Sequence, residues 1–343
     1  MSTQPGAAPG RELAGDLGHL RELGDLRDLL AELLPTVRAY SIPMRTRFRG
    51  ITVREGALIE GPAGWGEFSP FAEYGPRECA RWLACALEAA AVGWPEPLRD
   101  QVGVNVTVPA VGPDAARVIV AGSGCRTAKV KVAERGQDGA QDIARVAAVR
   151  DALGPAGRIR IDANGGWQVD QAARMIGALA PFGLEYAEQP CASLAELARL
   201  RRLVDVPLAA DESIRRAEDP MAVRAAGAAD IVVLKAQPLC GVRAALRIAA
   251  QCALPVVVSS AIETSIGLAA GVALAAALPE LRYDCGLATM SLLTADVTAS
   301  PLAASGGMIP VRAAVLDAKH FAACAADPAP WVARMLAAAE YLG

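Results

Sequence analysis

The chain has 343 residues, of which 53% are hydrophobic and only 4% aromatic, and its formal net charge at pH 7 is −3. This length accommodates a (β/α) barrel of about 250 residues together with a smaller domain. The weakly negative charge, without a basic stripe, argues against nucleic acid as a partner. The longest apolar segment, residues 267–279, is too short to span a membrane, so it predicts a buried helix.

The cysteines and histidines restrict the chemistry. Eight cysteines occur without a CxxC spacing, and the N-terminus lacks a basic segment followed by an apolar one. We therefore expect buried, reduced thiols in a cytoplasmic protein. The two histidines, His19 and His320, lie near the two ends of the chain. Because they are remote from the charged residues described below, we expect neither a zinc site nor a histidine base.

The first third of the chain predicts an extension followed by a small domain. Residues 1–34 combine a polar Gly/Pro-bearing stretch with leucines at helical spacing, which predicts an N-terminal extension that is helical or flexible. Residues 37–45 and 50–61 alternate like strands, and a helical pattern follows over residues 76–91. We therefore predict an antiparallel α+β capping domain over residues 35–102.

A repeated strand–helix alternation follows and runs to about residue 290. It predicts a (β/α) barrel as the catalytic domain over residues 103–311. The C-terminal residues 312–343 are expected to return and pack on the first domain. The candidate barrel strands are 103–107, 127–132, 158–162, 183–187, 206–210, 230–235, 255–259 and 282–286.

Five of these strand-like runs end on charged residues, in the order Lys, Asp, Glu, Asp, Lys. The acids and the last lysine follow one another at about 25 residues, the length of one βα unit. Because the carboxyl ends of barrel strands converge on one mouth, we expect these charges to meet there. They are Lys129 with Lys131, then Asp162, Glu188, Asp211 and Lys235.

The three acids predict a metal site. Any one of Asp162, Glu188 and Asp211 could instead cap a helix or lie on a surface turn. Three converging carboxylates would repel one another unless a cation neutralised them, and oxygen ligands favour Mg²⁺, with Mn²⁺ as a substitute, over zinc. We expect Asn164, which shares the face of Asp162, to order a metal-bound water, and Glu212 to pair with a lysine.

The lysines predict acid–base chemistry. Lys129 and Lys131 are two residues apart and therefore share a face, and Val130 and Val132 would pack outward against helices. A solvated edge strand is the alternative for this pair, and a salt bridge to a barrel carboxylate is the alternative for Lys235. On strands two and six the lysines would flank the mouth, an arrangement that suits removal of a proton α to a carboxylate. That role would require a lysine pKa lowered towards neutrality.

The motifs KVK, DANGGW, EQP, DES and VLKAQ resemble the enolase superfamily, whose sites combine a lysine or histidine base with Mg²⁺. Within it they resemble the muconate lactonizing subgroup, and residues 40–74 resemble the actinobacterial o-succinylbenzoate synthases of that subgroup. The similarity covers roughly residues 37–315 and leaves the first 34 outside. It implies an α/β fold, with a modified TIM (β/α)7β barrel and an N-terminal α+β capping domain completed by the C-terminal segment.

The resemblance also implies roles for the charged residues. Lys131 would take the α-proton and then protonate the departing hydroxyl, Lys235 would stabilise the enediolate from the opposite face, and Lys129 would orient Lys131. The implied reaction is a syn dehydration of 2-succinyl-6-hydroxy-2,4-cyclohexadiene-1-carboxylate to 2-succinylbenzoate, in menaquinone biosynthesis. The implied Mg²⁺ ligands are Asp162, Glu188 and Asp211.

The residues that hold the rest of the substrate are less specific. Ser259 and Ser260, after the seventh predicted strand, are candidates for binding the succinyl group. Arg45 or Arg47 of the capping domain is a candidate for facing its carboxylate. A capping serine and a surface arginine are the ordinary alternatives.

Two other functions remain open from the sequence. An N-succinylamino acid racemase or dipeptide epimerase of the same subgroup would use both lysines as proton carriers, one on each face of the substrate. A non-catalytic barrel, serving as a scaffold or carboxylate-binding module, would have no use for the charged set. The expected partner is a small carboxylate, and monomer and homo-oligomer are equally open.

Overall fold

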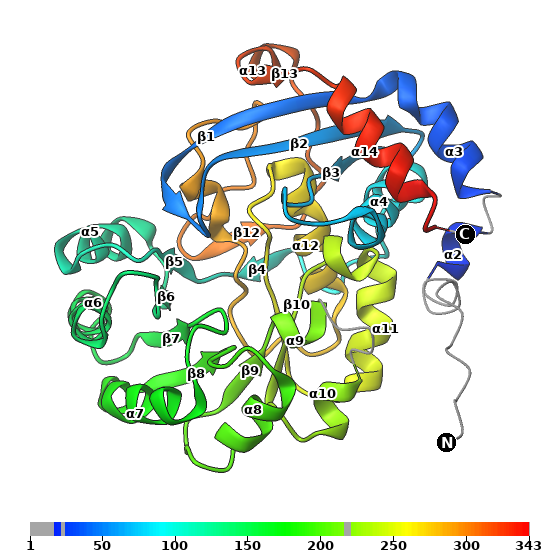
Figure 1. The fold of residues 1–343 in the computed structure, drawn as a ribbon. Coiled ribbons are helices and arrows are strands. Elements are labelled where there is room, and N and C mark those ends of the chain that lie inside the picture. The colour runs from blue at the N-terminus through cyan, green and yellow to red at the C-terminus, as the bar shows by residue number, and fades with distance from the viewer. Residues whose placement is uncertain (1–16, 22–24, 216–220, 343) are drawn as a thin grey trace, which may run out of the picture.

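The computed structural model describes residues 17–21, 25–215 and 221–342. Residues 1–16 and 22–24 of the predicted extension lie outside this range. Figure 1 shows a capping layer of long strands and helices lying over one end of a barrel. The chain crosses from the first part into the second and returns to the first at its C-terminal end.

The capping domain is built on a four-stranded sheet in the order β13-β1-β2-β3. Its pairs are antiparallel, as predicted. The β1–β2 connection is a tight turn in which Arg49 and Gly50 have φ values of 54° and 80°, the left-handed region that short hairpins favour. The third strand was not predicted separately. The strands are β1 (Arg38–Phe48), β2 (Ile51–Gly61), β3 (Gly64–Phe68) and β13 (Ala325–Ala326).

Three helices complete this domain. The helix predicted over residues 76–91 is α4 (Pro76–Ala91), and α14 (Ala329–Ala339) packs against it, so the C-terminal segment returns to the capping domain. The helix α3 (Leu26–Leu33) contacts α14 and β2. Its leucines at positions 26, 30 and 33 are buried, so this part of the predicted extension belongs to the folded capping layer. Apolar side chains on one face of a short helix explain the difference.

The barrel contains seven parallel strands in the order β11-β10-β9-β8-β7-β6-β5. Single bridges from Val104 to Cys285 and from Ser259 to Gly286 join its two edges, so the predicted strand 282–286 is reduced to two bridging residues. This is the modified (β/α)7β barrel. Its strands are β5 (Val106–Val108), β6 (Thr127–Lys131), β7 (Arg158–Asp162), β8 (Leu184–Glu188), β9 (Leu208–Ala210), β10 (Ile231–Leu234) and β11 (Val256–Val258).

The predicted first barrel strand, 103–107, is divided in two. β4 (Gln101–Gly103) pairs antiparallel with β12 (Met308–Pro310), and the barrel proper starts at β5. The α-helices of the barrel are α5 (Pro113–Ser123), α6 (Gly139–Leu153), α7 (Val169–Leu179), α8 (Leu194–Leu200), α9 (Glu212–Arg215), α10 (Ala222–Ala225), α11 (Val242–Cys252) and α12 (Ser265–Ala277). Two short helices, α2 (Gly18–Arg21) and α13 (Ala318–Ala322), lie outside it.

The apolar run predicted as a buried helix is α12, which is buried over almost its whole length. All eight cysteines are buried as well. Within the described ranges, no helix is both long enough and apolar enough to cross a membrane. Inside the barrel, Tyr186, Ala209, Ile231, Val233 and Val257 form a separate apolar cluster, which fills the space below the charged mouth.

Candidate active site

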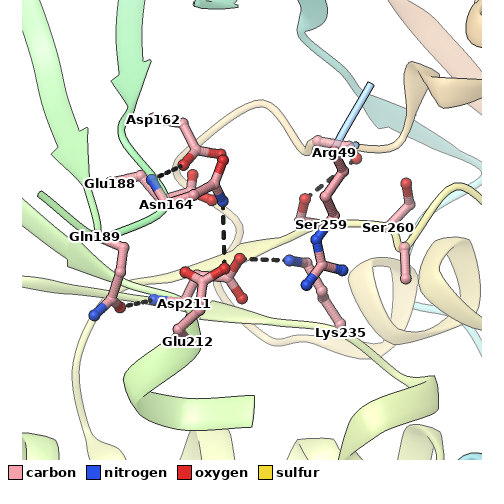
Figure 2. Close-up of polar contacts among 12 residues, drawn as sticks. Arg49, Asp162, Asn164, Glu188, Gln189, Asp211, Glu212, Lys235, Ser259 and Ser260 are labelled. Carbon is pink, nitrogen blue, oxygen red and sulfur yellow. Dashed lines mark hydrogen bonds and ion pairs between the residues drawn. The ribbon is translucent and has the colours of Figure 1, made fainter. Parts of the chain in front are cut away.

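The three predicted metal ligands lie at the carboxyl ends of neighbouring strands. Asp162 ends β7 and Glu188 ends β8, and the two residues are direct partners in the parallel register. Asp211 immediately follows β9. Each of the three is only 1% exposed. Figure 2 shows Asp162, Asn164 and Asp211 approaching one another above the strand ends.

Two lysines reach these carboxylates from β6. The Nζ of Lys129 lies 3.1 Å from Oε1 of Glu188 and 3.3 Å from Oδ2 of Asp162, so it bridges the two acids. The Nζ of Lys131 lies 2.5 Å from Oδ2 of Asp162 and 2.6 Å from Oδ1 of Asn164. The same ammonium group lies 5.2 Å from the centroid of the Phe48 ring, within cation–π range. Both lysines therefore point inward, as the pattern predicts.

The third lysine lies on the sixth barrel strand, across the mouth from the first two. Lys235 follows β10, and its Nζ lies 2.5 Å from Oδ2 of Asp211. Figure 2 shows this side chain directed towards Asp211. An amine-bearing side chain thus stands on each side of a mouth that carries buried carboxylates. This arrangement can hold an anionic substrate between two proton carriers.

The titratable groups of the site differ in burial and in the charges around them, and their pKa values shift in different directions. Burial, followed by repulsion from Asp162, raises the pKa of Glu188 to about 7. Burial also opposes the charge of Asp162, but the ammonium groups of Lys131 and Lys129 outweigh it and lower the pKa of that carboxyl. The pKa of Lys129 is raised, because Glu188 and Asp162 outweigh the desolvation of its ammonium group. Negative charge is therefore least well compensated at Glu188.

The donor set suits a hard divalent cation. Three buried carboxylates supply oxygen ligands of the kind that Mg²⁺ and Mn²⁺ prefer, and a cation would relieve the repulsion that raises the pKa of Glu188. In the described part of the chain, no three acidic, histidine or cysteine side chains are gathered as a preformed ligand set. Each of the three carboxylates is instead paired with a lysine. The fit of a divalent cation to these three residues therefore rests on their charge, their burial and their oxygen donors.

Strained backbone marks this end of the barrel. Several non-glycine residues just beyond the strand ends have positive φ values, a conformation that is uncommon and concentrated at functional sites. They are Ala133 after β6, Asn164 after β7, Gln189 after β8 and Ile262 after β11, with φ values of 59°, 46°, 38° and 65°.

Gln189 is a positioning residue that the sequence did not single out. Its Oε1 accepts from the backbone N–H groups of Asp211 at 3.0 Å and Ser213 at 3.2 Å. Its Nε2 donates to the carbonyl of Cys191 and to Oγ of Ser213. The glutamine after one metal-ligand candidate therefore fixes the backbone of the next. The EQP motif contains the residue, but nothing in the motif reveals that contact.

The capping domain covers the mouth and leaves a cavity of about 40 Å³ between the two domains. Ser259 and Ser260 line it, as predicted for substrate contacts, and their hydroxyls bond to the carbonyl of Gly286 and to Oγ1 of Thr289. The capping domain contributes Phe48, Arg49 and Phe71. Figure 2 shows Arg49 reaching towards the strand ends beside Ser259 and Lys235.

The two arginines predicted to face the substrate lie elsewhere. Arg45 and Arg47 are exposed, and neither lines the mouth; Arg45 lines a separate outer groove beside α5. The residue in the cavity is Arg49, whose guanidinium carbon lies 4.2 Å from the centroid of Phe71 and whose Nη2 donates to Oη of Tyr74 at 3.3 Å. Substrate contact by Arg45 or Arg47 stays a prediction, and the turn of the hairpin at Arg49 is a feature that a strand pattern does not reveal.

Asn164 occupies the centre of the charged set. Its Oδ1 accepts from Lys131, its Nδ2 donates to Oε1 of Glu212 at 3.3 Å, and its backbone N–H donates to Asp162. The side chain thus links a lysine on one strand to an acid beyond another. Its predicted role towards a metal-bound water stays a prediction.

Comparisons with known proteins identify the family. Residues 39–90 match the enolase N-terminal domain-like family and residues 113–315 match the enolase C-terminal domain-like family. The chain is 69% identical over 303 residues to an o-succinylbenzoate synthase of Thermobifida fusca, covering 88% of this chain and 96% of that protein. It is 54% identical over 314 residues to one of Mycolicibacterium smegmatis, covering 90% and 96%. The chain belongs to the o-succinylbenzoate synthase family of the enolase superfamily.

Solved structures agree with this assignment at the level of the fold. A muconate lactonizing enzyme from Pseudomonas fluorescens superposes with a TM-score of 0.74 at 23% identity, over 84% of this chain and 98% of that one. The resemblance to o-succinylbenzoate synthases that residues 40–74 predicted, within the superfamily that the charged motifs predicted, is confirmed by the two relatives above. The fold predicted from it, a barrel with a capping domain, is confirmed as well.

Proposed function

We propose that this protein is a divalent-metal-dependent o-succinylbenzoate synthase, a hydro-lyase acting in menaquinone biosynthesis. Its reaction would be the syn dehydration of 2-succinyl-6-hydroxy-2,4-cyclohexadiene-1-carboxylate to 2-succinylbenzoate. The observation that carries the proposal is the placement of Lys131 and Lys235 on opposite sides of a closed mouth with three buried carboxylates. Membership of the family supplies the substrate.

The proton movements can be assigned to residues of the chain. The neutral amine of Lys131 would accept the proton on the carbon α to the substrate carboxylate. The resulting ammonium group would return that proton to the departing hydroxyl, so the carbon–oxygen bond breaks and water leaves as the ring becomes aromatic. Lys129 would hold Lys131 in place through their shared contact with Asp162, at 3.3 Å and 2.5 Å.

Lys235 would act from the other side of the substrate. Its ammonium group, held by Asp211, would place positive charge opposite Lys131 where negative charge develops. Asp162, Glu188 and Asp211 would hold Mg²⁺, or Mn²⁺ as a substitute. When bound, the ion would neutralise the charge that develops on the substrate carboxylate and so lower the barrier to proton removal.

The succinyl arm would contact the wall formed by both domains. Ser259 and Ser260 offer hydroxyls, and Arg49 offers a guanidinium group at the same cavity. We propose that Arg49 takes the role first expected of Arg45 or Arg47. Its stacking on Phe71 leaves the edge of the guanidinium group for hydrogen bonds to a carboxylate.

An ultraviolet assay tests the reaction directly. Purified protein with Mg²⁺ should convert the cyclohexadiene substrate into the aromatic product, and a chelator should stop the conversion until Mg²⁺ or Mn²⁺ is restored. Protein that neither forms this product nor exchanges the α-protons of succinylated amino acids would exclude the catalytic proposal and leave a binding scaffold.

A racemase of the same subgroup is the second candidate, because two lysines on opposite faces also suit two-base chemistry. A Lys235→Ala variant separates the two, since racemisation needs both lysines as proton carriers and dehydration needs only one. Persistent α-deuterium exchange in that variant, without inversion, would argue against a two-base racemase.

The location in the cell is a further part of the proposal. Eight buried thiols fit a reducing cytoplasm, as predicted from the sequence. Whether the protein works as a monomer or a homo-oligomer stays open.

A further inference from the structure

The loop after β11 forms one wall of the cavity and contains the least favourable backbone of the mouth. Ser259, Ser260, Ala261 and Ile262 all line the cavity. Ile262 has a φ of 65° and is the β-branched member of the non-glycine residues with positive φ in the described chain. Within the loop, Oγ of Ser260 accepts from the backbone N–H of Ile262 at 3.3 Å. Because a branched side chain is a rare outlier in the left-handed region, a further contact from outside the loop would help to hold this conformation.

That contact comes from the capping domain. Arg54 of β2 is only 2% exposed, and its Nε donates to the carbonyl of Ile262 at 2.9 Å. The rest of the guanidinium group is fixed within its own domain: Nη1 donates to the carbonyl of Glu55, and Nη2 donates to the carbonyl and Oγ of Ser69. Its guanidinium carbon lies 4.7 Å from the centroid of the ring of Phe71, another residue of the cavity wall. One capping-domain side chain therefore contacts two walls.

A second capping-domain group fixes the far end of the same loop. Oε2 of Glu67 accepts from Oγ1 of Thr264 at 2.5 Å and from the backbone N–H groups of Thr264 and Gly267 at 3.2 Å and 3.1 Å. Glu67 therefore lies at the start of α12, where a carboxylate is favoured by the free N–H groups and the helix dipole. Tyr40 and Ser69 donate to its other oxygen. The loop is thus tied to the capping domain before and at the start of the helix.

We propose that Arg54 is a positioning residue, which holds Ile262 in the left-handed conformation and thereby sets the cavity wall formed by residues 259–262. The docking of the capping domain then also sets the shape of the substrate cavity, because the guanidinium group of Arg54 makes the contacts for both. The expected effect on the kinetics rests on the proposed function, whereas the expected effect on the conformation of the loop does not.

The first experiment is a double-mutant cycle with Arg54→Lys, Ile262→Gly and the double variant. Lysine keeps the charge next to Glu67 but cannot donate at once to Ile262 and Ser69. We expect R54K to lower kcat/KM by about 10- to 100-fold, the range for loss of a hydrogen bond from a charged group, mainly through KM. Glycine adopts the left-handed conformation without strain, so R54K should cost about threefold or less in the I262G background. Equal losses in the two backgrounds would overturn the proposal.

The second experiment measures the loop without the reaction. Hydrogen–deuterium exchange of a peptide covering residues 258–267 should accelerate at least tenfold in R54K, while α6 stays unchanged. The matched control is Arg243→Met. Arg243 also joins the two domains, by donating to Glu88 of α4 at 2.8 Å, but no contact of it with the loop is observed. If R243M accelerates exchange in the loop as much as R54K does, Arg54 contributes only to general docking and the proposal fails.

The two arms separate the possible failures. If the protein does not catalyse the dehydration but R54K still accelerates exchange in the loop, the proposed function fails and the role of Arg54 stands. Normal kinetics and normal exchange in R54K would remove the role of Arg54 alone. Ser69→Ala, which deletes one acceptor of the guanidinium group, supplies the same comparison if R54K does not fold; a three- to tenfold acceleration of loop exchange is expected there, and no acceleration would count against the proposal.

Discussion

The two ends of the barrel both contain buried charges, but they use different cations. At the amino ends of the strands, the guanidinium group of Arg160 is fully buried and packs against the rings of Tyr186 and Tyr283 at 4.9 Å and 5.7 Å. Its Nε donates to Glu185 at 2.6 Å, and Nη1 donates to Asn105 and to the carbonyl of Asp284. The guanidinium group is thus held at Nε and Nη1 as a structural pair with Glu185, whereas its buried Nη2 has no hydrogen-bond partner among the described residues.

The carboxyl ends have lysines instead. Lys129, Lys131 and Lys235 are single-nitrogen cations on flexible stems, each paired with a carboxylate. They do not offset the burial and the repulsion from Asp162 that raise the pKa of Glu188 to about 7. The backbone at this end is strained, whereas the apolar cluster below it is well packed. The contrast fits a structural role for the arginine end and, on the proposed function, an exchange of protons and ligands at the lysine end. Substitutions at the two ends should therefore have opposite consequences.

The largest effect is expected from the lysines of the mouth. Lys131→Met should lower kcat by at least about 10²- to 10⁴-fold, the usual contribution of a general acid–base group, with the unfolding free energy little changed. Steady-state kinetics of the dehydration and urea unfolding test the two halves of this prediction. A variant that keeps most of its activity would remove Lys131 from the acid–base role.

The complementary prediction concerns Arg160, at the amino ends of the barrel strands. Arg160→Met removes the main cation of the partly buried Glu185 and should destabilise the protein by about 2–3 kcal/mol, while kcat per folded molecule stays within a few fold. Urea unfolding and kinetics at a temperature where both proteins are folded would measure this. A large loss of kcat with unchanged stability would contradict the assignment of this end to structure.

The third prediction tests the carboxylates. Glu188→Gln should weaken activation by Mg²⁺ by about 10- to 100-fold in the concentration required, since it removes one charged oxygen ligand of a hard cation. Titration of the chelated protein with Mg²⁺ gives this value. Glu185→Gln, on the same strand but facing Arg160, is the control and should leave the Mg²⁺ requirement unchanged. Equal Mg²⁺ dependence in E188Q and the parent protein would exclude Glu188 as a ligand.

A smaller effect is expected from the arginine of the capping domain. Arg49→Met should raise KM by about tenfold with kcat within a few fold, because a charged hydrogen bond to the substrate carboxylate is lost. Arg47→Met is the matched control, since Arg47 lies two residues earlier, near the end of β1, and is exposed. If R47M raises KM and R49M does not, the placement of Arg49 towards the substrate is wrong.

These residues also show what the sequence can and cannot predict. The charged strand ends were predictable because a parallel barrel brings successive carboxyl ends to one mouth, whatever the loops do. The position of Arg49 at the cavity was not predicted, because it depends on a hairpin turn that the strand pattern does not reveal. The contacts of Gln189 with Asp211 and of Arg54 with Ile262 join different elements, so spacing along the chain gives no sign of them.

The packing of α3 and the reduction of the eighth strand were missed for the same kind of reason. Leu26, Leu30 and Leu33 form a helical pattern in either an extension or a packed helix, and only tertiary contact with α14 and β2 distinguishes the two. The segment 282–286 has a strand-like pattern, but it is joined to its neighbours only through Cys285 and Gly286. In both segments the local sequence pattern predicted the type of element but gave no information on which other elements it would contact.

The smallest predicted effect concerns stability and pH at the junction of the two domains. Glu263 is buried beside the strained loop, where its Oε2 accepts from the backbone N–H of Ala261 at 2.8 Å. Burial, followed by repulsion from Glu67, raises the pKa of Glu263 to about 7 from its ordinary value of 4.5. Between those two pH values the unfolded chain loses this proton and the folded protein keeps it. The folded state is therefore penalised progressively as the pH rises from about 4.5 to 7, and fully above that range.

Glu263→Gln removes this penalty while keeping an acceptor for Ala261. Because one pKa unit corresponds to about 1.4 kcal/mol, the variant should gain about 1–3 kcal/mol relative to the parent between pH 5 and pH 8. Urea unfolding at the two pH values measures that difference, and Glu280→Gln, at an exposed site, should show none. A difference that is the same at both pH values would mean that Glu263 is ionised throughout. Glu263 would then be compensated by its neighbours, as Glu185 is by Arg160 at the other end, and the contrast between the two ends would not extend to the junction of the domains.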